Sequence, residues 1–420
     1  MKYSPVQPSD VRGYVQLGFD AVRSVTDVVE AMHANIARTP WPWERVRGGR
    51  THGITGFVYN CVRAVTQAVA GSADVALSGL LPLVEHASGE VQTGYTRTAL
   101  VALVNGVVGD HLLATGNPLA QAMQWRIEGR PLQLSPPTES AAASEKSCAL
   151  VPQATGRVLV TLHGLCMSDS EWRQRDGYDL GAVVADALSA TRVDLLYNSG
   201  LHVSTNGHAL ARQLQALVDA WPVPVTKLYV LGFSMGGLLA RSACHYAAAA
   251  DLTWRERLHT MVFVGTPHHG APLERGGNWL QTAAGWVPYT APLARLGMLR
   301  SAGVTDLRYS NLLDEDWDDD DRFARNEDTR HAVPLPAGVR CLAVAGTLGA
   351  CRGDAKDRAL GDGLVPIASG LGEHHDAGWR LAIDEDDKML FCRTGHLGLL
   401  ARHDVGEWLA ARLSEPSTTT

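Results

Sequence analysis

From residue 157 onward, short runs of apolar and β-branched residues alternate with segments of helical periodicity. Each run has the length of a strand and each intervening segment has that of a helix. The strand-like runs cover 157–164, 192–198, 227–234 and 260–266, and the helical patterns cover 181–190, 207–221 and 236–248. This alternation predicts an α/β fold with a mostly parallel central sheet and helices on both faces.

The chain before this region has a different pattern. Apolar residues recur at three- and four-residue intervals over 11–36 and again over 54–69, which predicts an all-helical N-terminal region at residues 1–128. Residues 129–156 are rich in Pro, Ser and Ala and are interpreted as a linker with short first strands. The α/β domain then occupies residues 157–413, and a disordered tail is expected at 414–420.

Composition excludes several classes of protein. There are 37 Lys and Arg against 44 Asp and Glu, so the formal net charge of −7 predicts no basic surface for nucleic acid. The N-terminal residues lack the apolar core of a secretory signal, and no apolar segment fits a membrane span. Seven cysteines without a CxxC motif suit a reducing compartment. We therefore expect a cytoplasmic protein.

A GxSxG motif is the most specific signal of chemistry. It reads Gly232-Phe233-Ser234-Met235-Gly236 and stands between an apolar strand and a helix. A nucleophilic serine on a tight strand-to-helix turn needs small neighbours, because larger side chains would collide with the adjoining backbone. The motif and its context predict Ser234 as a nucleophile.

A serine hydroxyl needs a base to accept its proton and an acid to orient that base. Asp362 follows the strand at 339–347, and His396 precedes the last helix at 403–413. The chain order Ser234, Asp362, His396 is that of one known architecture. These residues are the predicted catalytic triad.

Other acids and histidines compete for these roles. His268 and His269 follow the strand at 260–266 and are expected to line the same cleft, although they stand in the wrong order for the base. Acidic neighbours place the pair at 374–375 in a solvated loop, and the acids at 384–387 are typical of an exposed turn. We therefore assign His268 and His269 to substrate contact or support of the site.

Acyl transfer also requires donors directed at the developing oxyanion. The backbone N–H of Met235 is placed for this at the start of a helix. A second donor is predicted at Leu165, in the His163-Gly164-Leu165 stretch that ends the first central strand. The alternative reading of that stretch is an ordinary strand exit with a packed His163.

Five short motifs stand together in the order of a known family. They are HGLC (163–166), GFSMGG (232–237), GTPHHG (265–270), DGLVP (362–366) and GHLG (395–398). With these motifs, residues 157–413 resemble an α/β-hydrolase, and most resemble bacterial lipases and the GPI inositol-deacylase (PGAP1-like) branch. The resemblance implies the same roles for Ser234, Asp362, His396, Leu165 and Met235. The helical first 128 residues depart from the minimal lipase fold.

An insertion at about residues 271–336 interrupts the rhythm of the sheet, where this fold commonly carries a lid. Its apolar residues include Trp279 and Trp286, which we expect to line an acyl pocket or to fill the insertion's own core. The acidic run 314–321 lacks the glycine-bearing spacing of an EF-hand and is interpreted as a solvated loop. We expect neither a metal nor a cofactor.

The sequence thus predicts a serine esterase or lipase that acts on a small-molecule ester or lipid through an acyl-enzyme. A GPI-deacylase-like lipid deacylase or a thioesterase would use the same triad. A non-catalytic lipid-binding module on this fold is the alternative from a different class. Peripheral contact with a lipid surface through the N-terminal helices is open, as is their packing on one another. The sequence does not specify the oligomeric state.

Overall fold

The computed structural model describes residues 9–22, 67, 95–134, 151, 153–271, 301–317 and 328–414. The chain divides into two compact units: Met1–Arg97 with His111–Ala120, and Thr98–Asp110 with Gln121–Thr420. The second unit contains the sheet and every residue of the predicted triad. We call it the α/β unit and call the other the helical unit.

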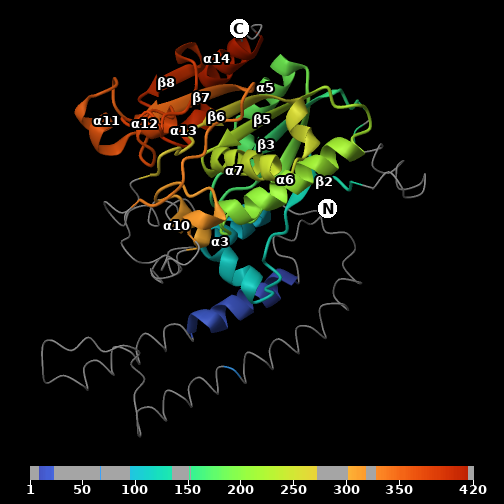
Figure 1. Ribbon diagram of the computed structural model, residues 1–420. Helices are drawn as coiled ribbons and strands as arrows, with labels where there is room; N and C mark the ends of the chain where they lie inside the picture. The colour runs from blue at the N-terminus through green and yellow to red at the C-terminus, as the bar shows by residue number, and fades with distance from the viewer. Residues whose placement is uncertain are drawn as a thin grey trace, which may run out of the picture. The chain divides into compact units, whose positions relative to one another are not determined.

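The sheet of the α/β unit has eight strands in the order β2-β1-β4-β3-β5-β6-β7-β8. Strand β1 pairs antiparallel with β2 on one side and with β4 on the other. Every other neighbouring pair is parallel (Figure 1). The strands are β1 (Gln124–Ile127), β2 (Arg130–Pro131), β3 (Arg157–Leu162), β4 (Thr191–Leu196), β5 (Lys227–Phe233), β6 (Leu258–Val264), β7 (Arg340–Thr347) and β8 (Lys388–Cys392). The predicted α/β fold with a mostly parallel central sheet is therefore confirmed.

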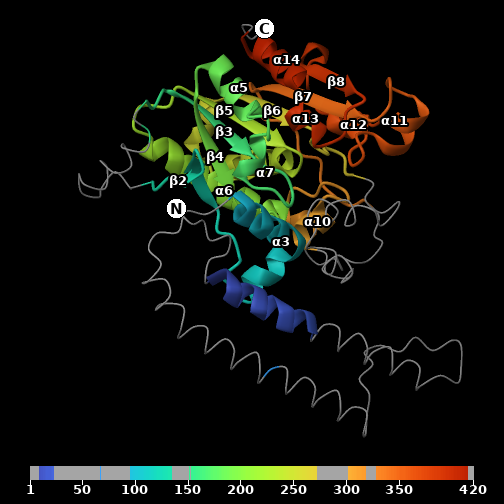
Figure 2. The same cartoon turned by 180° about the vertical axis from the view of Figure 1, so that it is seen from behind.

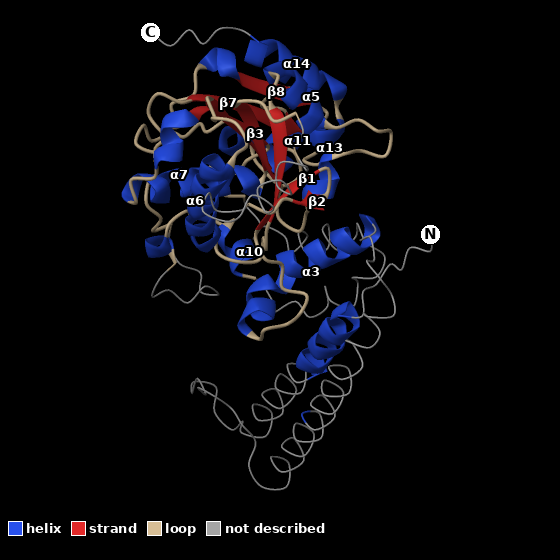
Figure 3. Ribbon diagram, turned by 90° about the vertical axis from the view of Figure 1, so that its right-hand side faces the viewer, coloured by secondary structure: helices blue, strands red, loops and turns tan. Residues whose placement is uncertain are grey.

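Strand residues alternate between two separate cores because successive side chains point to opposite faces of a sheet. In β5, Leu228 and Val230 belong to one buried cluster, and Tyr229 and Leu231 belong to the other. The first cluster includes residues of α6 (Val203–Ala220), α7 (Met235–Ala249) and α12 (Ile367–Gly370). The second includes residues of α5 (Leu180–Leu188), α13 (Gly398–Ala401) and α14 (His403–Ser414). Helices therefore cover both faces (Figure 3).

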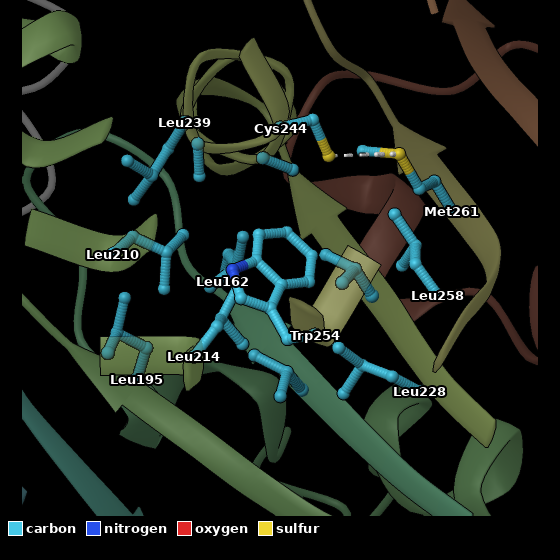
Figure 4. Close-up of a cluster of buried hydrophobic side chains, with 14 of the residues drawn as sticks. Leu162, Leu195, Leu210, Leu214, Leu228, Leu239, Cys244, Trp254, Leu258 and Met261 are labelled. Atoms are coloured by element: carbon cyan, nitrogen blue, oxygen red, sulfur yellow. Dashed lines mark hydrogen bonds between the residues drawn. The ribbon is translucent and has the colours of Figure 1, made fainter. Parts of the chain in front are cut away.

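Trp254 lies in the first core, between the sheet and the helices above it (Figure 4). It is 1% exposed, and its indole N–H donates to the Ala211 carbonyl in α6 at 3.0 Å. Leucines of β3, β5 and α6 surround the ring (Figure 4). A buried indole is stabilised only when its N–H has an acceptor, and the helix backbone supplies one.

Helix α3 (Tyr95–Ala114) contributes to both units. In the α/β unit, the carbonyls of Gly106 and Gly109 accept hydrogen bonds from Ser301 Oγ (2.6 Å) and Asn198 Nδ2 (2.9 Å). The predicted boundary at residue 128 therefore differs from the structure, which divides α3 itself. The expectation of helix up to 128 is wrong for Gln124–Ile127, which form β1.

The described part of the helical unit contains a helix at residues 9–22, as predicted. Asp10 forms an ion pair with Arg97 (2.6 Å), and Asp20 Oδ2 lies within hydrogen-bond distance of His111 Nε2 (2.9 Å). The buried positions include Leu17, whereas Val11 is 43% exposed, so the packed face is not the predicted apolar stripe. The second predicted stripe and the tail at 415–420 lie outside the described residues.

Figure 2 shows the α/β unit from behind. Within the part of the chain that the structure describes, no helix combines the length and the hydropathy needed to cross a bilayer.

Cys341 and Cys351 are both free thiols.

Candidate active site

Ser234 lies on the sharp turn between β5 and α7. Its backbone has φ 53° and ψ −122°, a conformation that a residue with a side chain rarely adopts. A Cβ on Gly236 would lie 2.2 Å from the Leu162 carbonyl oxygen, so this position accepts only glycine. The glycines of the motif thus allow the close backbone approach that holds Ser234 in its strained conformation.

Asp362 and His396 form a buried pair. The distance between His396 Nδ1 and Asp362 Oδ2 is 2.7 Å, and the two residues are 6% and 3% exposed. The other carboxylate oxygen, Oδ1, accepts from the N–H groups of Leu364 (2.9 Å) and Val365 (2.7 Å). The backbone N–H of His396 also donates to the backbone carbonyl of Asp362 at 2.9 Å. Both the carboxylate and the imidazole are therefore fixed in orientation.

The imidazole of His396 lies beside the turn that carries Ser234. The Ser234 N–H donates to the Val264 carbonyl at 2.9 Å, and a Cβ on the next residue, Gly265, would lie 3.0 Å from His396 Cε1. The rings of Phe233 and His396 have centroids 5.0 Å apart. The structure thus pairs His396 with Asp362 and places the His396 ring beside the turn that carries Ser234, at the ends of β5 and β6.

Two backbone donors are available beside the serine. The N–H groups of Leu165 and Met235 donate to no group among the described residues. A Cβ on Gly164 would lie 3.1 Å from Ser234 Cβ, so the loop that carries Leu165 adjoins the nucleophile. Met235 opens α7, where the first N–H groups have no partner inside the helix.

His163 orients the loop that carries Leu165, a role that the sequence alone did not decide. Its ring stacks on Tyr197 at 4.2 Å, and its Nε2 accepts from the Tyr197 N–H at 3.3 Å. The Nδ1 proton then donates to the Gly164 carbonyl at 2.8 Å, which fixes the peptide group whose N–H belongs to Leu165. Burial lowers the pKa of His163 to about 4, so the ring is neutral near pH 7.

His268 and His269 lie in the loop after β6 and line a cavity with Arg241 and Arg330. His268 is 2% exposed and meets Phe263 edge to face. Burial and the neighbouring Arg241 hold the pKa of His268 well below its ordinary range. Burial and Arg330 lower that of His269 to about 4. Their predicted part in substrate contact stays a prediction.

Sequence reasoning did not single out Arg241, although the signal is present. It is a cation among the small and apolar residues of the LLARSACH stretch in α7. It is 5% exposed, and its guanidinium contacts His268. A charge on the inward face of a buried helix is the pattern that would have identified it.

The structure describes part of two acidic segments that the sequence predicted to be solvent-exposed, the acids at 384–387 and the run 314–321. Asp387 is buried and bonded to Arg340 and Arg412, so the reading of an exposed acidic turn is wrong for this residue. In the run 314–321, Asp316 accepts from the N–H groups of Leu312 and Leu313, which is a structural role. Trp279 and Trp286, and with them most of the predicted lid at 271–336, lie outside the described residues.

Comparison with known protein families finds a match over part of the α/β unit. Residues 153–288 match the family described as PGAP1-like alpha/beta domain. No curated protein matches the sequence.

Solved structures that resemble the chain are distant in sequence. The mature lipase BlEst2 of Bacillus licheniformis shares 16% identity at a TM-score of 0.37, over 61% of this chain and 91% of its own. A hormone-sensitive lipase from a metagenome library shares 13% at a TM-score of 0.35, over 62% and 77%. Phospholipase PlaB of Legionella pneumophila, in complex with thio-NAD, shares 14% at 0.30, over 51% and 44%. The resemblance to the PGAP1-like branch of the α/β-hydrolases is carried by residues 153–288.

Proposed function

We propose that this protein is a carboxylic ester hydrolase that works through an acyl-enzyme intermediate. Ser234 is the nucleophile, His396 the base and Asp362 the acid that orients the base. The observation that carries the proposal is the buried His396 and Asp362 pair, 2.7 Å apart, beside the strained turn of Ser234. A base so oriented next to a serine is the arrangement that activates a hydroxyl.

The reaction follows from this geometry. As Ser234 Oγ bonds to the ester carbonyl carbon, its proton passes to His396 Nε2, and the N–H groups of Leu165 and Met235 stabilise the oxyanion. Collapse of the tetrahedral intermediate expels the alcohol, which takes that proton. Water then attacks the acyl-enzyme with His396 as base, and the acid leaves as Ser234 regains its proton.

An apolar cluster beside the oxyanion loop supports a preference for apolar acyl groups. Leu165 packs against a buried group that includes residues of α6, α7 and the described part of the predicted lid. Its buried members are Val203, Met235, Leu238, Leu307, Leu312, Leu313 and Val333. The PGAP1-like match favours a lipid ester as the second candidate substrate. A cytoplasmic location remains a prediction.

The experiment is hydrolysis of p-nitrophenyl esters of graded acyl length by the wild type and by Ser234→Ala. We expect the variant to lose at least 10³-fold in kcat, since the nucleophile is gone, with an unchanged Tm. Ser242→Ala is the matched control, because this buried serine of the same helix donates to the Leu312 carbonyl rather than to a reacting group. Equal turnover by the wild type and Ser234→Ala would reject the assignment.

A further inference from the structure

A cavity of about 240 Å³ lies in the α/β unit between α7, the loop after β6 and the segments around residues 330 and 380. Its lining includes Arg241, His268, His269, Arg330, Trp379 and Arg380. None of the described lining residues is an Asp or a Glu. The volume is far above the ~10–15 Å³ that one water requires, so the cavity has room for a small anion.

Arg241 is a buried cation without a carboxylate among its described hydrogen-bond partners. Its Nη2 donates to the Val333 carbonyl, and its Nη1 contacts His268 Nδ1 at 3.4 Å. Its Nε has no hydrogen-bond partner among the described groups. A buried charge is unfavourable unless an opposite charge or several hydrogen bonds compensate it. We therefore expect an anion to bind beside Arg241.

His268 adds a second donor without an acceptor. Since a guanidinium can only donate, His268 Nδ1 is the acceptor in the contact with Arg241, and the proton of the neutral ring is on Nε2. His268 Nε2 is buried and has no partner among the described groups. Arg241 and His268 thus line one cavity, and each carries a buried donor atom whose hydrogen bond is unmade among the described groups.

Arg330 brings a second guanidinium to the cavity. It is 4.6 Å from the centre of the Trp379 ring, and its Nη1 donates to the carbonyls of Tyr309 and His268. Its Nε is 3.2 Å from Asp328, which is therefore its ion partner. Asp316, the other carboxylate nearby, is bonded to His331. These acids compensate Arg330 and leave Arg241 uncompensated.

The two guanidinium groups lie close enough to affect each other. Burial and the charge of Arg330 lower the pKa of Arg241 to about 10, so both stay protonated near pH 7. Two guanidinium groups that share a cavity favour an anion with several oxygens, because such an anion can accept hydrogen bonds from both. A phosphate group meets this requirement better than a single carboxylate does.

The cavity also lies near the candidate triad. Gly265 adjoins the His396 ring, and His268 follows Gly265 by three residues. Three Cα steps of about 3.8 Å limit the separation of these two Cα atoms to roughly 11 Å. One lining residue of the cavity therefore lies within this distance of a residue that adjoins the His396 ring.

We propose that this cavity is a binding site for a phosphate group, with Arg241, Arg330 and His268 Nε2–H as its donors. The site holds either free phosphate or the phosphate of a phosphorylated ester. Binding of free phosphate does not depend on Ser234, so the proposal stands apart from the proposed hydrolase activity.

The first experiment measures binding of inorganic phosphate by calorimetry to full-length wild type, Ser234→Ala, Arg241→Gln and Arg330→Gln. We expect equal affinity for the wild type and Ser234→Ala, and a loss of about tenfold or more in the two arginine variants. Arg257→Gln removes an exposed arginine and should bind as the wild type does. Acetate should bind at least tenfold more weakly than phosphate.

Folding of the variants is checked by their Tm without phosphate, and Arg241→Lys keeps the charge if the glutamine variant is unstable. Lysine should retain part of the affinity, because it supplies a charge without the planar donor set. Absence of phosphate binding by the wild type at millimolar concentration would overturn the proposal. So would equal binding of acetate, or affinity unchanged in both Arg241→Gln and Arg330→Gln.

A second experiment separates the two sources of the phosphate. Hydrolysis of matched short esters with and without a phosphate is measured in the wild type and Arg241→Gln. If the cavity holds the substrate's phosphate, Arg241→Gln raises KM for the phosphorylated ester alone, and inorganic phosphate competes with that ester only. If the cavity instead holds free phosphate, inorganic phosphate changes the hydrolysis rates of both esters to the same extent. KM values and phosphate responses that are unchanged for both esters would rule out the phosphorylated ester as the source of the phosphate.

Discussion

His396 and His268 are both buried in the α/β unit, and each follows the end of its strand by four residues, β8 for His396 and β6 for His268. Their charged neighbours differ. Asp362 accepts from His396 Nδ1, whereas Arg241 donates to His268 Nδ1. The first ring therefore presents an unprotonated Nε2, and the second presents an Nε2–H.

This difference shows how one side chain supports two kinds of chemistry on one sheet. A carboxylate behind the ring stabilises the imidazolium that forms when a hydroxyl loses its proton, which suits a general base. A guanidinium behind the ring opposes protonation and leaves a neutral donor, which suits recognition of an anion. The residue that forms a hydrogen bond with Nδ1 thus determines the chemical role of each histidine.

The largest effect is expected from Asp362→Asn. The amide oxygen of asparagine would keep the hydrogen bonds from Leu364 and Val365, so the NH₂ group would face His396 Nδ1. The proton of the ring would then move to Nε2, which could no longer accept the proton of Ser234. We expect kcat for p-nitrophenyl acetate to fall on the order of 10³ to 10⁴-fold.

Asp386→Asn is the matched control, because Asp386 is exposed. It should leave kcat unchanged. A kcat for Asp362→Asn within a factor of three of the wild type would show that the contrast between the two histidines has no catalytic meaning.

The second effect concerns stability against pH. Because the pKa of His268 is well below its ordinary range in the fold, the unfolded chain binds a proton first as the pH falls below about 6.5. Stability is therefore complete above that pH and declines toward lower pH. One proton changes the free energy of unfolding by about 1.4 kcal/mol per pH unit, or about 2 kcal/mol between pH 6.5 and 5.

His268→Gln should remove this share of the pH dependence, since glutamine does not titrate and its oxygen can still accept from Arg241. Urea unfolding at pH 5, 6 and 7 measures it. His375→Gln, at an exposed position, should keep the slope of the wild type. An identical slope in the wild type and His268→Gln would mean that His268 takes up its proton in the fold as readily as in the unfolded chain.

The smallest effect is expected at Thr266, in the loop that joins the two histidine sites. Its side chain is fully buried, and Oγ1 has no hydrogen-bond partner among the described groups. Thr266→Val removes this hydroxyl at nearly constant volume and should raise the free energy of unfolding by roughly 1 kcal/mol.

Thr161→Val provides the opposite case, because the buried Thr161 hydroxyl donates to Asp194 at 2.5 Å. That variant should lose roughly 1–3 kcal/mol. Destabilisation of similar size in both variants would indicate that Thr266 has a partner of its own.

The α/β sheet could be predicted because its pattern is local. Strands such as Lys227–Phe233 are apolar at both odd and even positions, as two buried faces require, and glycines mark the turn at Ser234. The chain order of Ser234, Asp362 and His396 predicted which loops meet. The buried pair of His396 and Asp362 follows from these motifs.

Other features depend on contacts between distant segments, which no local pattern encodes. Periodicity predicted an all-helical region through residue 128, but pairing with β4 makes Gln124–Ile127 a strand. Burial of Arg241 depends on the Val333 carbonyl, 92 residues away. Asp387 was read as exposed from its acidic neighbours, although Arg340 and Arg412 bury it.

The central claim, that Ser234 is the nucleophile activated by His396, is tested most directly by covalent labelling. A fluorophosphonate probe is incubated with the wild type and with Asp362→Asn, and the labelled peptide is identified by mass spectrometry. We predict a single adduct on Ser234, formed at least a hundredfold more slowly in Asp362→Asn. An adduct on another residue, or labelling of Ser234 at equal rates in both proteins, would contradict the claim.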